Sequence, residues 1–188
     1  MIPCCRSGYR VHFYGANECI GSQMVVAWKE THSKDKVTIS NTNIDPSNFS
    51  KLYKEIQQAE RVVCFVEQLD NVKTPLYKNL HDNLVGPMML ATLCQQLDVH
   101  LLYVSIENIT SCIHEEDKPT FVVLEEYSTV RGCTHEMMKW HSNIVCNCHV
   151  RMPVMHEDQD PKSLTYIQNI IPTLVELSRE AETGTFNF

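Results

Sequence analysis

Hydrophobic and polar positions in this chain alternate between short apolar runs and longer stretches with helical spacing. The apolar runs predict strands at 9–14, 37–40, 61–66, 99–105 and 143–150, with a short strand-like end at 184–188. Apolar residues three or four positions apart predict helices over 20–31, 45–56, 74–97, 124–140 and 163–179. Strands that alternate with helices favour an α/β fold with a doubly wound parallel sheet.

The turn after the first strand carries the most specific local pattern. Gly15 ends the apolar run, and Gly21 opens a stretch with helical spacing. A strand, a glycine turn and a helix present backbone N–H groups and a helix N-terminus to a phosphate. A full dinucleotide fingerprint carries a third glycine between the other two, and Glu18 stands there. Ligands of such sheets bind at the carboxyl ends of strands, where Gly15, Val66 and Ser105 are expected to converge.

Composition and charge exclude only a few classes of protein. The chain has 188 residues, a net charge of −7 and nine cysteines. This length predicts a single domain after a loose leader at residues 1–8. The acidic balance argues against nucleic acid as a partner, and no apolar run reaches the length of a membrane span. An odd number of cysteines without an export signal predicts reduced thiols in a cytoplasmic protein.

Four stretches resemble one enzyme family in order and spacing. They are the Gly15–Gly21 turn, Asp82–Ala91, Glu116–Pro119 followed by Tyr127-Ser128, and Val150–Pro153 followed by the ending Thr185–Phe188. In these stretches the chain resembles an extended short-chain dehydrogenase/reductase of the rhamnose branch, such as dTDP-4-dehydrorhamnose reductases and UDP-4-keto-6-deoxyglucose 3,5-epimerase/4-reductases. The resemblance implies one NAD(P)-binding Rossmann-like domain over 1–188. Residues 153–188 are then the remnant of a substrate lobe that is largely missing.

The resemblance also implies catalytic positions, and several of them are changed. Reduction in this family needs a Tyr acid, a Lys four residues later and a hydroxyl on the fourth strand. Tyr127 keeps the first place, while Arg131 takes the Lys place and preserves its charge with a different geometry. The hydroxyl place falls on Ile106. Ser105 precedes it, and alternation along a strand points it to the opposite face.

The same resemblance implies a nicotinamide cofactor, NAD or NADP, and no metal. The residues that it assigns to cofactor binding are Gly15, Asn17, Cys19, Ile20, Gly21, Asn41, Val66 and Asn83. Asn41 follows the second strand in place of a charged residue, so the sequence favours neither NAD nor NADP. If the Glu18 carboxylate lies about 5 Å from the pyrophosphate, repulsion between the two charges weakens the binding free energy of the dinucleotide. At an effective dielectric near 20 this loss is about 3 kcal/mol, which is about a hundredfold in affinity.

The epimerase positions are changed as well. The family's Cys and Lys fall on Asn108 and about Ile167, although Cys112 and Lys162 lie nearby in the sequence. A separate run, Cys146–His149, has the residue types of a zinc site. Alternation places its two thiols on one face and His149 on the other, which favours thiols buried in the core.

Three hypotheses follow from these substitutions. The first is a catalytically impaired relative that acts as a binding or interaction protein, and the substituted positions favour it. The second is an active NAD(P)-dependent reductase of a 4-keto-6-deoxy nucleotide sugar. The third is a shortened product that needs another chain to complete its site. The implied partners are a nucleotide sugar and a homodimeric or heteromeric protein partner, with no nucleic acid and no membrane.

Overall fold

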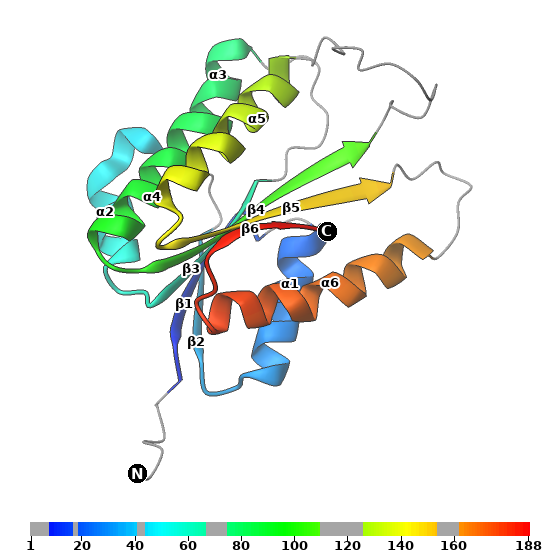
Figure 1. Cartoon of the computed structure of the whole chain (residues 1–188). Coiled ribbons are helices and arrows are strands. Elements are labelled where there is room, and N and C mark those ends of the chain that lie inside the picture. The colour runs from blue at the N-terminus through cyan, green and yellow to red at the C-terminus, as the bar shows by residue number, and fades with distance from the viewer. Residues whose placement is uncertain (1–7, 17–18, 41–43, 67–74, 110–125, 154–161) are drawn as a thin grey trace.

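The fold is one parallel sheet covered by helices on both faces (Figure 1). The computed structural model describes residues 8–16, 19–40, 44–66, 75–109, 126–153 and 162–188. Its strands are β1 (Arg10–Tyr14), β2 (Lys36–Ser40), β3 (Arg61–Val66), β4 (His100–Ile109), β5 (Val145–Pro153) and β6 (Gly184–Asn187). The six strands lie in the order β2-β1-β3-β4-β5-β6, and every neighbouring pair is parallel. The predicted doubly wound α/β sheet is therefore confirmed.

Helical segments connect the strands, largely where the sequence predicted them. They are α1 (Cys19–Thr31), η1 (Pro46–Asn48), α2 (Phe49–Ile56), α3 (Leu76–Leu80), η2 (His81–Val85), α4 (Gly86–Gln96), α5 (Glu126–Met138), η3 (Lys139–His141) and α6 (Lys162–Arg179). The Asp45 side chain caps η1 by accepting from the backbone N–H of Ser47 at 2.9 Å, as its position before Pro46 predicted. No helix in the described part of the chain is long and apolar enough to cross a lipid bilayer.

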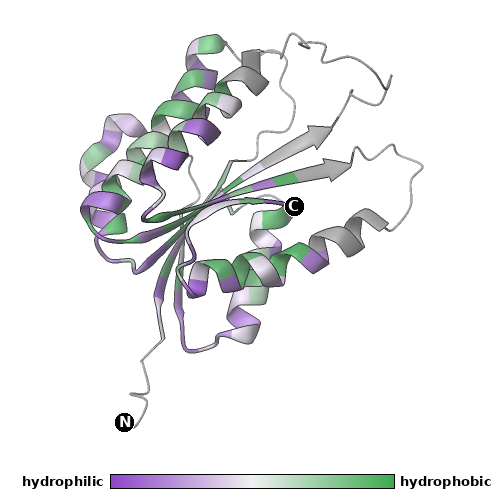
Figure 2. Cartoon of the chain, in the orientation of Figure 1, coloured by the Kyte–Doolittle hydropathy of each residue, from purple (hydrophilic) through white to green (hydrophobic). Residues whose placement is uncertain are grey.

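Two hydrophobic clusters hold the layers together, one on each face of the sheet. The first joins α1 and α6 to strand residues such as Phe13, Val63 and Leu102. The second joins α2, α4 and the end of α5 to the alternate residues, such as Tyr14, Cys64 and Leu101. Figure 2 shows hydrophobic residues recurring along the helices and the strands. This alternation follows from the two-residue period of a strand with both faces covered.

The helix predicted over 74–97 contains a π-helical segment, η2, between α3 and α4. The physical cause is Pro87, which lacks the N–H that would bond the carbonyl of Asn83 four residues earlier. The Thr134 hydroxyl on α5 donates to this Asn83 carbonyl instead. The irregular turn therefore joins two helices, and sequence periodicity alone did not predict it.

Candidate functional site

The candidate site lies at the carboxyl ends of β1 and β3, where the strand order reverses. Gly15 follows β1 with a φ of +69°, a left-handed conformation that favours glycine. A Cβ at this position would lie 2.2 Å from the carbonyl oxygen of Phe65 on β3. The two strand ends approach so closely that only glycine fits, which fixes the path of the chain into α1.

Gly21 in the first turn of α1 is restricted in a different way. Its Cβ would lie 2.8 Å from Cα of Ala16 and 3.2 Å from the Phe65 ring. The start of α1 therefore packs directly on the turn, and Ile20 beside it is buried in the first cluster. Gly15 and Gly21 fit the turn that presents backbone N–H groups to a pyrophosphate. Of the other residues assigned to this turn, Asn17 and Glu18 lie outside the described residues.

Ser105 on β4 is the candidate hydroxyl that the structure describes. It pairs in register with Val66 of β3 on one side and with His149 of β5 on the other, and it is 2% exposed. The register thus places Ser105 opposite Val66, which follows the Phe65 that Gly15 approaches, and the convergence of the three residues at one site stays a prediction. The strand continues through Ile109, four residues beyond its predicted end, so Ile106 and Asn108 belong to the strand. The side chains of Val66, Ile106 and Asn108 lie outside the described part.

A histidine pair accompanies Ser105, and the sequence did not predict it. The rings of His135 on α5 and His149 on β5 lie 5.3 Å apart, nearly perpendicular to each other. Burial lowers the pKa of His135, with a smaller contribution from His149, and this favours a neutral imidazole. The Asn147 amide donates to the His135 backbone carbonyl at 3.1 Å and ties the strand to the helix. The signal in the sequence was weak, because it needs the β4–β5 register.

Tyr127 and Arg131 lie in α5, the helix that also carries His135 and Thr134. Their backbone positions match the prediction of a helix over this segment, and their side chains lie outside the described residues. Lys162 and Ile167 lie in α6 with side chains likewise outside it, and Cys112 is not described. The catalytic roles of Tyr127, Arg131 and Ser105 stay predictions.

Asn83, predicted to contact the cofactor, lies in η2 and is 1% exposed. Its amide nitrogen donates to the side-chain oxygen of Asn79 at 2.8 Å and to the Asn79 carbonyl at 3.2 Å. The structure therefore gives this residue a role in helix packing, and its contact with a cofactor stays a prediction. Asn41 and the Cys19 side chain are not described.

The cysteines of β5 lie in the core, as the alternation along that strand predicted. Cys146 and Cys148 are fully buried on one face with their sulfur atoms 3.7 Å apart, and His149 belongs to the other face. The hydrogen-bond contact with the Cys146 thiol, followed by burial, raises the pKa of Cys148 above that of an exposed thiol. Within the described ranges, no three His, Cys, Asp or Glu side chains gather to hold a metal ion.

The known proteins that this chain resembles include nucleotide-sugar enzymes. No protein-family model matches the chain. Protein L780 of Acanthamoeba polyphaga mimivirus is 33% identical over 143 residues, which cover 60% of this chain and 48% of L780. The bifunctional dTDP-4-dehydrorhamnose 3,5-epimerase/reductase of Arabidopsis thaliana is 24% identical over 143 residues, which cover 59% of this chain and 46% of that enzyme. The chain thus spans about half the length of the curated relatives that it matches.

Solved structures give the same result. The crystal structure of L780, described as a UDP-rhamnose synthase, superposes with a TM-score of 0.71 and 26% identity over 96% of this chain and 75% of that one. The dTDP-4-dehydrorhamnose reductase of Bacillus anthracis, solved with NADP, has a TM-score of 0.72 and 13% identity over 98% of this chain and 76% of that one. WbmG of Bordetella bronchiseptica, solved with NAD, has a TM-score of 0.67 and 13% identity, covering 100% of this chain and 74% of that one. In sequence and in fold, this chain therefore resembles the rhamnose branch of the extended short-chain dehydrogenase/reductases.

Proposed function

We propose that this chain is a catalytically impaired relative of the rhamnose-branch epimerase/reductases that retains a weakened site for NAD or NADP. The dinucleotide would lie at the carboxyl ends of β1 and β3, with its pyrophosphate at the start of α1. In the resembling enzymes this cofactor supplies hydride for reduction of a keto sugar. The role proposed for this chain is binding, of a nucleotide or of a protein partner.

The close approach of Gly15 to the Phe65 carbonyl is the observation that carries the binding part of the proposal. It supports a turn with the geometry that a pyrophosphate requires. The substitutions support the impairment. Glu18 adds a negative charge where an anion would bind, Ile106 has no hydroxyl, and Arg131 replaces the lysine that holds the ribose and lowers the pKa of the tyrosine.

A cofactor titration tests this proposal. Purified full-length chain is titrated with NADPH and with NADH while nicotinamide fluorescence is followed. We expect half-saturation near or above the millimolar range, and we expect Glu18→Gly to tighten it by about tenfold to a hundredfold. Glu30→Gln, which alters an exposed acid near the other end of α1, serves as the matched control and leaves affinity unchanged. Micromolar saturation of the unmodified chain, or an unaltered affinity in Glu18→Gly, contradicts the proposal.

The second candidate function is an active NAD(P)-dependent reductase of a 4-keto-6-deoxy nucleotide sugar. The similarity to L780, whose structure is described as that of a UDP-rhamnose synthase, favours it. Turnover of such a keto sugar with NADPH by the unmodified chain supports this candidate over the first. Turnover by the double variant Ile106→Thr with Arg131→Lys, and not by the unmodified chain, would mean that the substrate pocket is retained. That result supports the first candidate, a catalytically impaired relative.

The remaining proposals concern location and assembly. The described cysteines Cys64, Cys94, Cys133, Cys146 and Cys148 are free thiols, which supports a reducing, cytoplasmic location. The exposed apolar side chains Leu76, Tyr77 and Val85 on α3 and η2 support a homodimer or a protein partner on this side. Light scattering on the full chain and on Tyr77→Glu measures the homodimer directly.

A further inference from the structure

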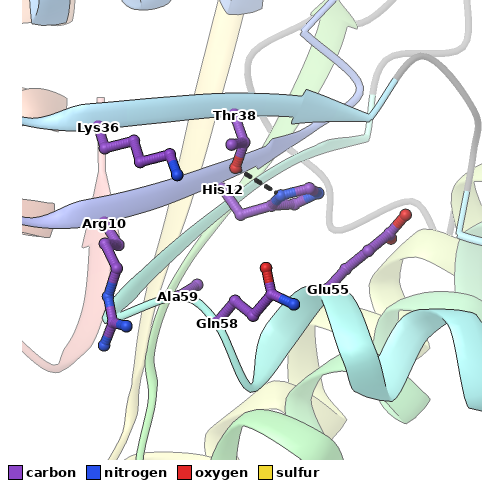
Figure 3. A pocket seen from close by; sticks show the side chains of 7 residues that line it. All are labelled: Arg10, His12, Lys36, Thr38, Glu55, Gln58 and Ala59. Carbon is purple, nitrogen blue, oxygen red and sulfur yellow. Dashed lines mark hydrogen bonds between the residues drawn. The ribbon is translucent and has the colours of Figure 1, made fainter.

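A cavity lies away from the candidate cofactor site, toward the amino end of the sheet. It has a volume of about 480 Å³ and lies between β1, β2 and the carboxyl end of α2 (Figure 3). Lys36 and Thr38 on the edge strand β2 are exposed, so α2 does not close this side of the sheet. The volume lies within the range of small-molecule sites.

Positive charge gathers at one end of this cavity. Arg10 and Lys36 are in register on neighbouring strands, which brings two cations side by side. The Arg10 guanidinium is 3.3 Å from Glu60, whereas Lys36 makes no ion pair within the described residues. Like charges directly opposite each other destabilise a sheet unless a counterion joins them. This end of the cavity therefore suits an anion.

Two residues further along both strands, the register pair His12 and Thr38 joins a buried imidazole to a hydroxyl group. Nδ1 of His12 is 2.8 Å from the Thr38 hydroxyl, and that hydroxyl is 3.2 Å from the carbonyl oxygen of Val11. The hydroxyl has a single hydrogen, so it donates either to Val11 while Nδ1 of His12 donates to it, or to Nδ1 itself. Burial lowers the pKa of His12 and favours a neutral ring, so Nε2 can take part in one hydrogen bond as an acceptor or as a donor.

The Nε2 atom of His12, a residue that lines the cavity, has no hydrogen-bond partner among the described residues. His12 is 7% exposed, and this nitrogen is buried. Native proteins rarely leave a buried polar nitrogen unpaired, because the lost hydration is not replaced. A hydroxyl group of a ligand suits this nitrogen in either tautomer, because a hydroxyl both donates and accepts.

The other end of the cavity also offers acceptors. Glu55 lies on α2, and one of its carboxylate oxygens accepts the Tyr14 hydroxyl at 2.8 Å. Its second oxygen is 3.9 Å from Lys51 and keeps capacity for a further donor. Figure 3 shows Glu55 at the far side of the cavity from Arg10. The lining thus places cations at one end and acceptors at the other.

We propose that this cavity binds a small hydroxylated anion, that is, a sugar carrying one phosphate or carboxylate group. Its anionic group lies against Lys36 and Arg10, one hydroxyl group forms a hydrogen bond with His12 Nε2, and another donates to Glu55. The site goes beyond the proposed function, because its lining takes Arg10 and His12 from β1 and uses none of the residues assigned to the dinucleotide.

Calorimetric titration of the full chain at pH 7.5 tests the proposal with four probes. Glucose 6-phosphate and gluconate carry both features, inorganic phosphate carries only the anion, and glucose carries only the hydroxyl groups. We expect glucose 6-phosphate or gluconate to bind at least tenfold more tightly than phosphate and glucose. The tighter of the two identifies the anionic group. If neither exceeds phosphate and glucose, the proposal is wrong.

Variants and a nuclear-spin measurement locate the binding. Lys36→Gln should weaken binding of the better probe at least fivefold, and Lys34→Gln, an exposed lysine outside the lining, should leave it unchanged. Both changes are on the surface, so both variants should fold. The nitrogen resonance of His12 Nε2 should move on binding as the nitrogen gains a hydrogen-bond partner. Unchanged affinity in Lys36→Gln, or a His12 Nε2 resonance that does not move on binding, contradicts the proposal that the ligand binds in this cavity.

Discussion

The two ends of β1 are organised by different physics. At its carboxyl end, Gly15 and Gly21 satisfy close packing against Phe65 and Ala16. At its amino end, polar groups distant in sequence are joined by hydrogen bonds. Both carboxylate oxygens of Asp35 are used there, by the Tyr9 N–H at 2.8 Å and by the Trp28 indole at 2.9 Å. Close packing therefore determines the structure at the carboxyl end of β1, and hydrogen bonding determines it at the amino end. The two ends should respond differently to substitution and to pH.

The largest effect is expected at the carboxyl end. Gly15→Ala places a Cβ 2.2 Å from a backbone carbonyl at a positive φ, and we expect a loss of about 4 kcal/mol in the free energy of unfolding. Chemical denaturation at pH 7.5 measures it. Gly132→Ala on α5 is the matched control, because nothing lies within 4 Å of its Cβ, and it should gain about 0.5–1 kcal/mol. Equal effects of the two changes would contradict the steric account.

The next effect tests the hydrogen bonds of the amino end. Trp28→Phe removes the indole N–H that donates to Asp35 and leaves a space in a fully buried position. A hydrogen bond to a charged group contributes about 1.5–3 kcal/mol, so we expect a loss of about 2–3 kcal/mol in the free energy of unfolding. Denaturation of Val26→Ala, an exposed position on the same helix, provides the baseline. A loss below about 0.5 kcal/mol would mean that the Asp35 contacts contribute little.

The hydrogen-bonded amino edge of the sheet, which includes the amino end of β1, should also make stability depend on pH. The responsible group is His100 at the start of β4. Burial lowers the pKa of His100 to about 4, from 6.5 in the unfolded chain. The Glu182 carbonyl accepts from Nε2 at 2.6 Å, so a second proton has only the buried Nδ1. Because the folded pKa is lowered, stability is complete above about pH 6.5 and falls as the pH drops toward 4. This group contributes about 2 kcal/mol to the loss between pH 7.5 and pH 5.

The variant His100→Gln separates this contribution. Its amide nitrogen can donate to Glu182 without titrating, so about 2 kcal/mol of the difference in stability between pH 7.5 and pH 5 should disappear. Denaturation curves for both proteins at the two pH values give the comparison. A pH dependence that is the same in the variant would assign it to other groups.

The smallest effect returns to the carboxyl end. Gly21→Ala places a Cβ 2.8 Å from Cα of Ala16, at a residue without the left-handed φ of Gly15, and we expect a loss of about 1–2 kcal/mol. Because no titratable group is involved, the loss should be equal at pH 7.5 and pH 5. A loss that grows with acidity would break the contrast between the two ends of β1.

Local pattern was sufficient for most elements. The continuous apolar run at β3 fixed its bounds, and Asp45 before Pro46 correctly marked the start of a helix. The segment over 74–97 was less predictable, since the π turn depends on Pro87 and on a hydroxyl from α5. Likewise β4 runs to Ile109 because it pairs with β5 through Pro153, and such pairing extends a strand beyond its own apolar run.

The residues of the candidate site likewise fall into those that local sequence patterns predicted and those that they did not. Gly15, Gly21 and the alternation of Cys146 and His149 were readable, because a turn and a strand impose their geometry on nearest neighbours. The His135–His149 pair and the cavity beside His12 were not. Each depends on which strands are neighbours and in what register, and on which helix lies above them.

The alternation of strands and helices, the glycine turn after β1 and the substitutions at positions 18, 106 and 131 follow from the order of residues alone. These are properties of single residues and of periods of two or about four residues. The strand order, the Asp35 network and the burial of His12 Nε2 without a partner among the described residues follow from the fold. A buried nitrogen loses its hydrogen bonds because residues far apart in the chain cover it, and no local pattern encodes that burial.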